Sequence, residues 1–273
     1  MPVAGFSAVI LKLNGVTFPF YFEILGLRLH PHVVFETIAY AVGARLYFFE
    51  RRRLPAAAQI PLEQNLWLLV GCIFGAWGLS KLLAWGESPE YYWSLRTDPR
   101  SALLGGKTIV GGLLGGWIGV ELAKKRLGIT RSAGDAFVLP LTAGIAIGRI
   151  GCFLTGLPDR TYGLATSLPW GVDFGDHVHR HPTQLYESLF VLALGTIVLL
   201  AAGRARPAWP AGRAFRLFLL GYFAFRLVIE FIKPREPLLG PLSAIQLASL
   251  IGVVFCFISL RRACPTAPTS TPS

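Results

Sequence analysis

The 273-residue sequence has few charged side chains: aspartate, glutamate, lysine and arginine together make up 15% of it. Soluble globular proteins carry about 25%. Hydrophobic residues make up 53%, and they form runs long enough to cross a bilayer as helices. This composition argues against a soluble enzyme and predicts a polytopic membrane protein.

Cysteine is also scarce, with four residues in the whole chain. Cys72, Cys152 and Cys256 lie within apolar segments and Cys264 lies in the tail, so the sequence gives no disulfide framework. Residues 1–22 lack a charged segment followed by a small-residue cleavage site, and we therefore expect no cleaved signal peptide. No internal repeat is visible.

Apolar segments of helical length predict an all-α bundle of seven transmembrane helices in a single domain over residues 1–262. Residues 1–32 are expected at the outer surface, with a hairpin turn at Asn14-Gly15, and residues 263–273 are expected to be a disordered tail. The predicted spans are residues 33–49, 65–85, 102–122, 136–156, 184–202, 215–232 and 242–260.

Positive charge gives the expected orientation. The net charge of +11 is divided among short clusters between the apolar runs, which favours membrane topology over a nucleic-acid partner. Basic-only clusters follow the first, third, fifth and seventh spans, whereas mixed or acidic loops follow the others. The positive-inside rule then places the N-terminus outside and the C-terminus in the cytoplasm.

Two arginines lie within the outer half of predicted spans. Arg149 stands between Gly148 and Gly151, and Arg226 is in the sixth span; a rise of about 1.5 Å per residue puts each roughly 10 Å from the outer end. A charge that faces lipid costs several kcal/mol, so both side chains should point inward and meet an anion. Other polar residues expected in the same outer half are Glu36, Lys107, Gln184, Glu187 and Glu230.

Two interpretations of these charges stay open. Arg149–Glu187 and Arg226–Glu230 could be structural ion pairs that join helices, although buried pairs barely repay their desolvation. Alternatively, the two guanidiniums bind one phosphate, because the planar fork of arginine matches phosphate oxygens. A phosphate that enters sideways from a bilayer belongs to a phospholipid.

Several motifs, in the order of the chain, are similar to those of the prolipoprotein diacylglyceryl transferase family. The resemblance covers roughly residues 33–260. The motifs are Gly111-Gly112-Leu113-x-Gly115, Gly148-Arg149-Ile150-Gly151, the run HPTQLYE at 181–187, Tyr222-x-x-x-Arg226-x-x-x-Glu230-Phe231, and Leu242-Ser243-x-x-Gln246-Leu247.

The resemblance implies a multi-pass enzyme of the bacterial inner membrane. Such enzymes move the diacylglyceryl group of phosphatidylglycerol onto the cysteine of a lipobox-bearing prolipoprotein and release glycerol phosphate. For this chain we expect phosphatidylglycerol or a related anionic phospholipid as the donor. It implies no cofactor and no metal. Arg149 and Arg226 would be catalytic, and the substrate-binding residues would be Tyr222, Gln184, Glu187, Glu230, Gly163, His181, Gly111 and Gly112.

The sequence departs from the family pattern on the acceptor side. The family has a histidine before Gly-Gly-Leu where this chain has Val110, and Cys152 replaces the asparagine after Gly-Arg-x-Gly. The family's tyrosine on the first span aligns loosely with Glu36. These departures leave open a different acceptor, or a lipid-binding or transport protein that has lost catalysis.

The missing histidine raises the question of the general base. Lys107, three residues before Val110 and expected on nearly the same helix face, is the catalytic candidate; an interfacial lysine that snorkels to head groups is the alternative. His181 is expected to fix a loop, and His177-x-His179-x-His181 is not expected to bind metal. Cys152 is expected to be a small apolar replacement rather than a nucleophile.

Overall fold

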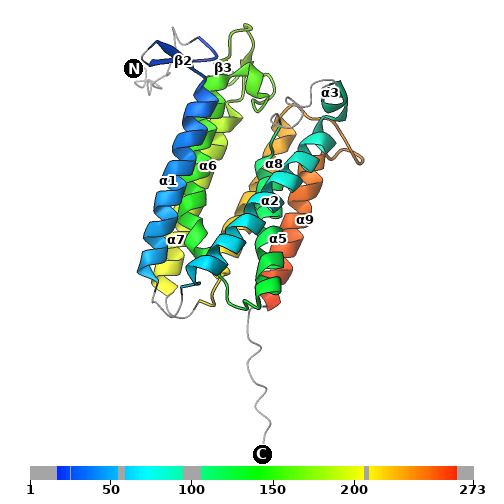
Figure 1. Cartoon of the computed structure of the whole chain (residues 1–273). Coiled ribbons are helices and arrows are strands. Elements are labelled where there is room, and N and C mark those ends of the chain that lie inside the picture. The colour runs from blue at the N-terminus through cyan, green and yellow to red at the C-terminus, as the bar shows by residue number, and fades with distance from the viewer. Residues whose placement is uncertain (1–16, 25, 55–58, 95–105, 206–208, 263–273) are drawn as a thin grey trace, which may run out of the picture.

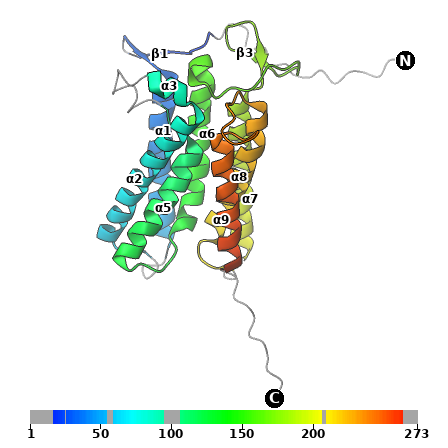
Figure 2. The same ribbon diagram turned by 90° about the vertical axis from the view of Figure 1, so that its right-hand side faces the viewer.

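The computed structural model describes residues 17–24, 26–54, 59–94, 106–205 and 209–262. Within these residues seven helices have 17 residues or more, and they run side by side (Figures 1 and 2). They are α1 (Pro31–Arg53), α2 (Leu62–Glu87), α5 (Ile109–Leu127), α6 (Val138–Thr155), α7 (Thr183–Ala205), α8 (Arg213–Ile229) and α9 (Ala244–Arg262).

Short elements connect and cover the bundle. Strands β1 (Phe22–Ile24) and β2 (Leu27–Leu29) form one antiparallel hairpin, and β3 (Val172–Asp173) and β4 (His179–Arg180) form another. Both hairpins and helix α3 (Pro89–Ser94) lie at the same end of the bundle (Figure 1). Single turns of 3-10 helix precede α6 (η3, Gly134–Phe137), follow it (η4, Leu157–Asp159) and follow α8 (η5, Glu230–Ile232).

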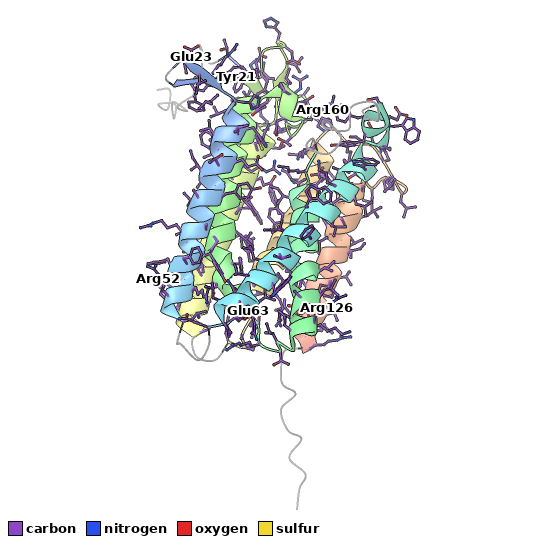
Figure 3. The ribbon with its side chains drawn as sticks, in the orientation of Figure 1. Tyr21, Glu23, Arg52, Glu63, Arg126 and Arg160 are labelled. Carbon is purple, nitrogen blue, oxygen red and sulfur yellow. The ribbon has the colours of Figure 1, made fainter. Side chains whose placement is uncertain are left out.

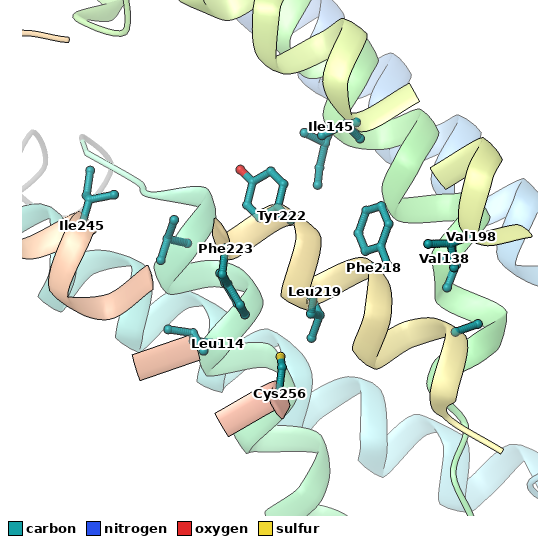
Figure 4. Packing of buried hydrophobic residues seen from close by; sticks show 13 residues of the cluster. Leu114, Val138, Ile145, Val198, Phe218, Leu219, Tyr222, Phe223, Ile245 and Cys256 are labelled. Atoms are coloured by element: carbon teal, nitrogen blue, oxygen red, sulfur yellow. The ribbon is translucent and has the colours of Figure 1, made fainter. Parts of the chain in front are cut away.

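The helices pack in neighbouring pairs around α8. α1 lies along α6, α6 along α7, α2 along α5, and α8 along α9. Figure 4 shows Phe218, Leu219, Tyr222 and Phe223 of α8 reaching between α6 on one side and α5 and α9 on the other. All four of these side chains are fully buried, so α8 lies at the centre of the core. This packing fixes the position of the end of α8 that bears Arg226.

Glycines allow α2 and α5 to touch backbone to backbone. A Cβ on Gly115 would lie 2.1 Å from the Gly75 carbonyl oxygen, and one on Gly119 would lie 2.0 Å from that of Gly71. Any larger residue would push the helices apart. Gly115 and Gly119 therefore lie on the face of α5 that packs against α2.

The contact of α1 with α6 depends on Gly151. A Cβ there would lie 2.5 Å from the Phe35 Cβ, so the start of α1 sits directly against the last turns of α6. Gly156, with φ of +70°, then ends α6 and turns the chain into η4. This local geometry brings side chains of α1, α6 and η4 to one place.

The helical fold class is confirmed, and each predicted span falls on one of the seven long helices. Four of these helices, α2, α6 with its preceding turn, α7 and α9, are long and apolar enough to cross a membrane. Helix α8 has 17 residues, and α1 and α5 end in basic clusters, which lowers their apolar content. The seven-span topology and its orientation stay predictions.

The predicted third span is placed too early at its start. Lys107 and Thr108 precede the helix, and the Thr108 hydroxyl caps it by accepting a hydrogen bond from the Gly111 N–H at 3.2 Å. Lys107 is therefore not on the helix face with Val110, because the cap sets the first helical residue at Ile109. The predicted turn at Asn14-Gly15 and the tail 263–273 lie outside the described residues.

Candidate active site

Five buried charged side chains form a continuous chain of ion pairs, which we call the arginine cluster: Arg149, Glu187, Arg226, Glu230 and Lys233. Arg149 Nε and Arg226 Nη1 lie 2.9 and 2.8 Å from the same oxygen, Oε2 of Glu187. Arg226 also pairs with Glu230, one turn later, and Lys233 Nζ lies 3.5 Å from Glu230 Oε1. The two predicted pairs are present, and Glu187 joins them into one unit.

Tyr222 completes the cluster from the core side. Its hydroxyl donates a 2.6 Å hydrogen bond to Glu187 Oε1, and its ring lies in the apolar core beside Phe223 (Figure 4). Tyr222 and Arg226 are one turn apart on α8, so both reach the same carboxylate of α7. Both oxygens of Glu187 thus accept from groups on α8, which holds the two helices and their charges in fixed positions.

Gln184 is a buried polar residue whose side-chain amide has unused hydrogen-bonding capacity. It is 1% exposed, and neither its Nε2 nor its Oε1 has a hydrogen-bond partner. It lies in the first turn of α7, three residues before Glu187 and so on nearly the same face. A buried amide without hydrogen-bond partners costs about 1–3 kcal/mol of stability. An unpaired amide in the same helix turn as Glu187 is therefore consistent with a group that hydrogen-bonds a ligand.

Lys233 also belongs to this cluster, although no sequence motif singles it out. It follows η5, beyond the end of α8, and its side chain is 7% exposed. Burial, reinforced by the neighbouring Arg226, lowers the pKa of Lys233 to about 8, while Glu230 opposes the shift. Helical periodicity does not mark Lys233, because α8 ends at Ile229 and the 3-10 turn η5 lies between them.

The family-motif glycines and His181 have structural contacts. A Cβ on Gly111 would lie 2.6 Å from the Ser80 Cα, whereas Gly112 has open space on that side. The Gly163 N–H donates to the His181 carbonyl at 2.9 Å, and His181 Nδ1 lies 3.3 Å from the Tyr186 hydroxyl. These contacts tie the loop after η4 to the start of α7; substrate binding by these residues stays a prediction.

The outer loop carries the other two histidines of the HVHRH run. His177 is almost fully exposed, and His179 lies on β4 at the surface. The loop is organised by Asp173, whose Oδ1 accepts from three successive backbone N–H groups, of Gly175, Asp176 and His177; these bonds lower the pKa of Asp173 against the opposing effect of desolvation. Among the described residues the three histidines do not converge as metal ligands.

Lys107 lies away from the arginine cluster. Its Nζ lies 3.1 Å from Glu36 Oε1, and its side chain is 53% exposed. The structure thus pairs two of the predicted outer polar residues with each other. The catalytic role of Lys107 stays a prediction.

Comparison with known proteins agrees with the motifs. The family model described as prolipoprotein diacylglyceryl transferase matches residues 19–261. The chain belongs to this family. It is 40% identical over 236 residues to the phosphatidylglycerol–prolipoprotein diacylglyceryl transferase of Bordetella bronchiseptica, covering 81% of this chain and 86% of that protein. It is 33% identical over 245 residues to the protein of the same name from Geobacter sulfurreducens, covering 82% of this chain and 90% of the relative.

Proposed function

We propose that this transferase moves the diacylglyceryl group of phosphatidylglycerol onto the cysteine thiol of a prolipoprotein and releases glycerol phosphate. One observation carries the proposal: two buried guanidiniums, Arg149 and Arg226, meet at a single carboxylate oxygen of Glu187. In the reaction a carbon–sulfur bond forms at the glyceryl carbon, and the bond from that carbon to the phosphate oxygen breaks.

The charges of the arginine cluster suit this chemistry. Its ion pairs link three cationic groups with two carboxylates, so with Lys233 protonated one positive charge is left over for a singly charged phosphodiester. As the phosphate leaves, it gains negative charge, and fixed guanidiniums stabilise that charge in a dry site. Glu187 orients both guanidiniums before the lipid arrives, which lowers the reorganisation that catalysis requires.

We assign roles to the other residues on the same basis. Gln184, with its unpartnered amide, would bind the head group, and Tyr222 would hold Glu187 in place. Glu230 would orient Arg226. His181, Gly163, Gly111 and Gly112 would shape the walls of the substrate site rather than touch the reacting atoms.

We propose that all seven long helices cross the bacterial inner membrane, with the arginine cluster in the outer half. The last turns of α1, α5, α7 and α9 all carry basic residues. Figure 3 supports a shared end for these clusters, since Arg52 and Arg126 lie together at one end and Glu23 and Arg160 at the other. The positive-inside rule makes the basic end cytoplasmic.

The test uses the full chain purified in detergent, head-group-labelled phosphatidylglycerol and a lipobox peptide. We expect labelled glycerol phosphate and a thioether-linked peptide, and we expect Arg149→Ala and Arg226→Ala to abolish both. Arg126→Ala, at the opposite end of the bundle, is the matched control and should retain activity. Release without peptide modification would indicate another acceptor, and retention of intact lipid would indicate binding or transport.

A further inference from the structure

Three potential metal ligands from three elements converge beside the arginine cluster: His32 of α1, Cys152 of α6 and Asp159 of η4. We call them the cysteine cluster. His32 Nδ1 lies 3.9 Å from Cys152 Sγ and 3.2 Å from Asp159 Oδ1, and all three ligand atoms lie within 4.8 Å of one another. The sequence separates His32 from Cys152 by 120 positions, so the fold alone brings them together.

These separations suit one tetrahedral cation. Zinc bonds of about 2.3 Å to sulfur and about 2.0–2.1 Å to nitrogen or oxygen place neighbouring ligand atoms roughly 3.2–3.6 Å apart. The distance from His32 Nδ1 to Asp159 Oδ1 already fits, whereas Cys152 Sγ, which lies 3.9 Å from Nδ1, has to move closer to both partners. A thiolate, a neutral imidazole and a carboxylate also supply the two negative charges that a divalent cation requires.

Surrounding groups hold the ligands as outer partners do at metal sites. His32 Nε2, the nitrogen that points away from the cysteine, faces Glu36 Oε2 at 3.8 Å, and Glu36 is itself held by Lys107 at 3.1 Å and by the Tyr40 hydroxyl at 3.0 Å. A carboxylate behind a ligating histidine fixes its ring and tautomer. The Thr161 hydroxyl donates to Asp159 Oδ2, which leaves Oδ1 free for the cation.

A nucleophilic Cys–His–Asp relay explains the geometry less well. Such a relay uses the two ring nitrogens separately, one toward the nucleophile and the other toward the carboxylate. Here sulfur and carboxylate face the same nitrogen, Nδ1 of His32. A covalent intermediate at Cys152 would also be a thioether, which has no good leaving group for a second transfer.

Arg149 lies close enough to influence the site, because its Nη1 is 3.7 Å from Cys152 Sγ. Cysteine binds metal as the thiolate, and here a guanidinium stands beside it. Its repulsion of a cation is reduced because Glu187 already lies 2.9 Å from Arg149 Nε. The same contact places the cysteine cluster next to the proposed phosphate site.

We propose that His32, Cys152 and Asp159 bind a zinc-type divalent cation whose fourth coordination position takes the acceptor thiol. Three protein ligands leave that position open, as in catalytic zinc sites. A coordinated thiol loses its proton, here to water at the outer surface. Its sulfur then attacks the glyceryl carbon, and the phosphate departs with the bonding electrons toward Arg149 and Arg226. The inference rests on the proposed function and supplies the thiol activation that Val110 cannot.

Metal binding is tested first, on the full chain in detergent without lipid. After loading with Zn²⁺ and removal of excess metal, we expect about one zinc per chain, and Co²⁺ loading should give a thiolate-to-cobalt absorption band. Cys152→Ala and His32→Ala should lose both signals, whereas Cys72→Ala, in α2, should keep them. Equal metal content in the wild type and in variants that keep the wild-type unfolding temperature would overturn the site, since only adventitious binding would remain.

The acceptor step is tested by adding a lipobox peptide to the Co²⁺-loaded protein. We expect a stronger and shifted thiolate band, and no change with a peptide whose cysteine is serine. An unchanged band with the cysteine peptide overturns thiol coordination. The outcome is independent of lipid transfer: a band shift without release of glycerol phosphate from labelled lipid would support the metal site and refute the proposed transferase function instead.

Discussion

The arginine cluster and the cysteine cluster meet at Arg149 but differ in origin. The first is built almost entirely from residues that match the family motifs, on α6, α7 and α8. The second lies where the sequence departs from the pattern: Cys152 stands in place of the family's asparagine, and its partner His32 comes from α1. The comparison indicates that the residues proposed to bind the phosphate match the family motifs, whereas those proposed to bind the acceptor depart from them.

The two clusters also differ in what holds them. The arginine cluster is deeply buried and its charges compensate one another, so removing one partner leaves an uncompensated charge that costs about 3–5 kcal/mol. In the cysteine cluster His32 is half-exposed, with 41% of its side chain accessible. Variants of the first should therefore affect both folding and chemistry, and variants of His32 should affect chemistry alone.

The largest expected effect comes from breaking the arginine cluster at Arg226. Arg226→Ala should lower kcat by about 100- to 1000-fold, the loss typical of removing one donor that stabilises developing negative charge. Arg226→Lys keeps the charge but loses the second hydrogen bond and should recover part of the loss. Labelled lipid turnover measures the effect, and the unfolding temperature reveals how much reflects misfolding. Near-normal turnover in Arg226→Ala would refute the phosphate assignment.

Breaking the cysteine cluster should be milder and selective. His32→Ala should remove one of the three protein ligands of the proposed metal site and so reduce thioether formation, with little change in phosphatidylglycerol binding. The physical reason is that His32 acts on the acceptor and does not touch the arginines. Binding of a non-reactive phosphatidylglycerol analogue reports on the arginine cluster, and the KM for peptide reports on the cysteine cluster. Equal losses in lipid binding and in thiol transfer would show that the two clusters do not act on separate substrates.

Raising the pH should deprotonate Lys233, which should weaken lipid binding without lowering stability. Below its pKa of about 8 the lysine adds a positive charge to the arginine cluster, so the KM for the anionic lipid should rise as the pH passes through 8. Lys233→Arg stays charged and should flatten that rise. The groups that face Lys233 are Arg149, Arg226, Glu187 and Glu230.

The free energy of unfolding should increase as the pH rises above 8, whereas lipid binding should weaken. Because the unfolded chain holds the proton up to the ordinary value of 10.5 and the folded chain loses it near 8, the unfolded state binds more protons between these values. The contribution of Lys233 to the free energy of unfolding therefore rises with pH from 8 to 10.5. Thermal unfolding at pH 7.5 and 9.5, compared between wild type and Lys233→Met, measures this sign.

The sequence was most informative where burying a charge costs much free energy. Arg149 and Arg226 could be singled out because an arginine in an apolar span needs an anion, and their pairing with Glu187 and Glu230 followed from helix positions. The shared oxygen of Glu187 could not be predicted, because it depends on the rotation of α7 against α8. Lys233 was taken as a terminal charge, since the pattern does not reveal that the η5 turn carries it into the interior.

The cysteine cluster was beyond the reach of sequence patterns for a different reason. His32 and Cys152 have no periodic relation, and they meet because Gly151 lets α1 approach α6 and Gly156 turns Asp159 back over the helix end. A search by spacing favours the three loop histidines, which do not converge among the described residues. Tertiary contact between the first and fourth predicted spans was the missing information.

The smallest expected effect comes from Lys107, and it tests whether this residue takes part in the chemistry of the cysteine cluster. Lys107→Ala removes a partly exposed ion pair to Glu36, which is worth less than about 1 kcal/mol, so turnover should fall by only a few fold. Glu36→Gln, one step closer to His32, should weaken zinc binding by about 10- to 100-fold. If Lys107→Ala instead abolished turnover while zinc stayed bound, the lysine and not the metal would activate the acceptor thiol, and transfer would not depend on the cysteine cluster.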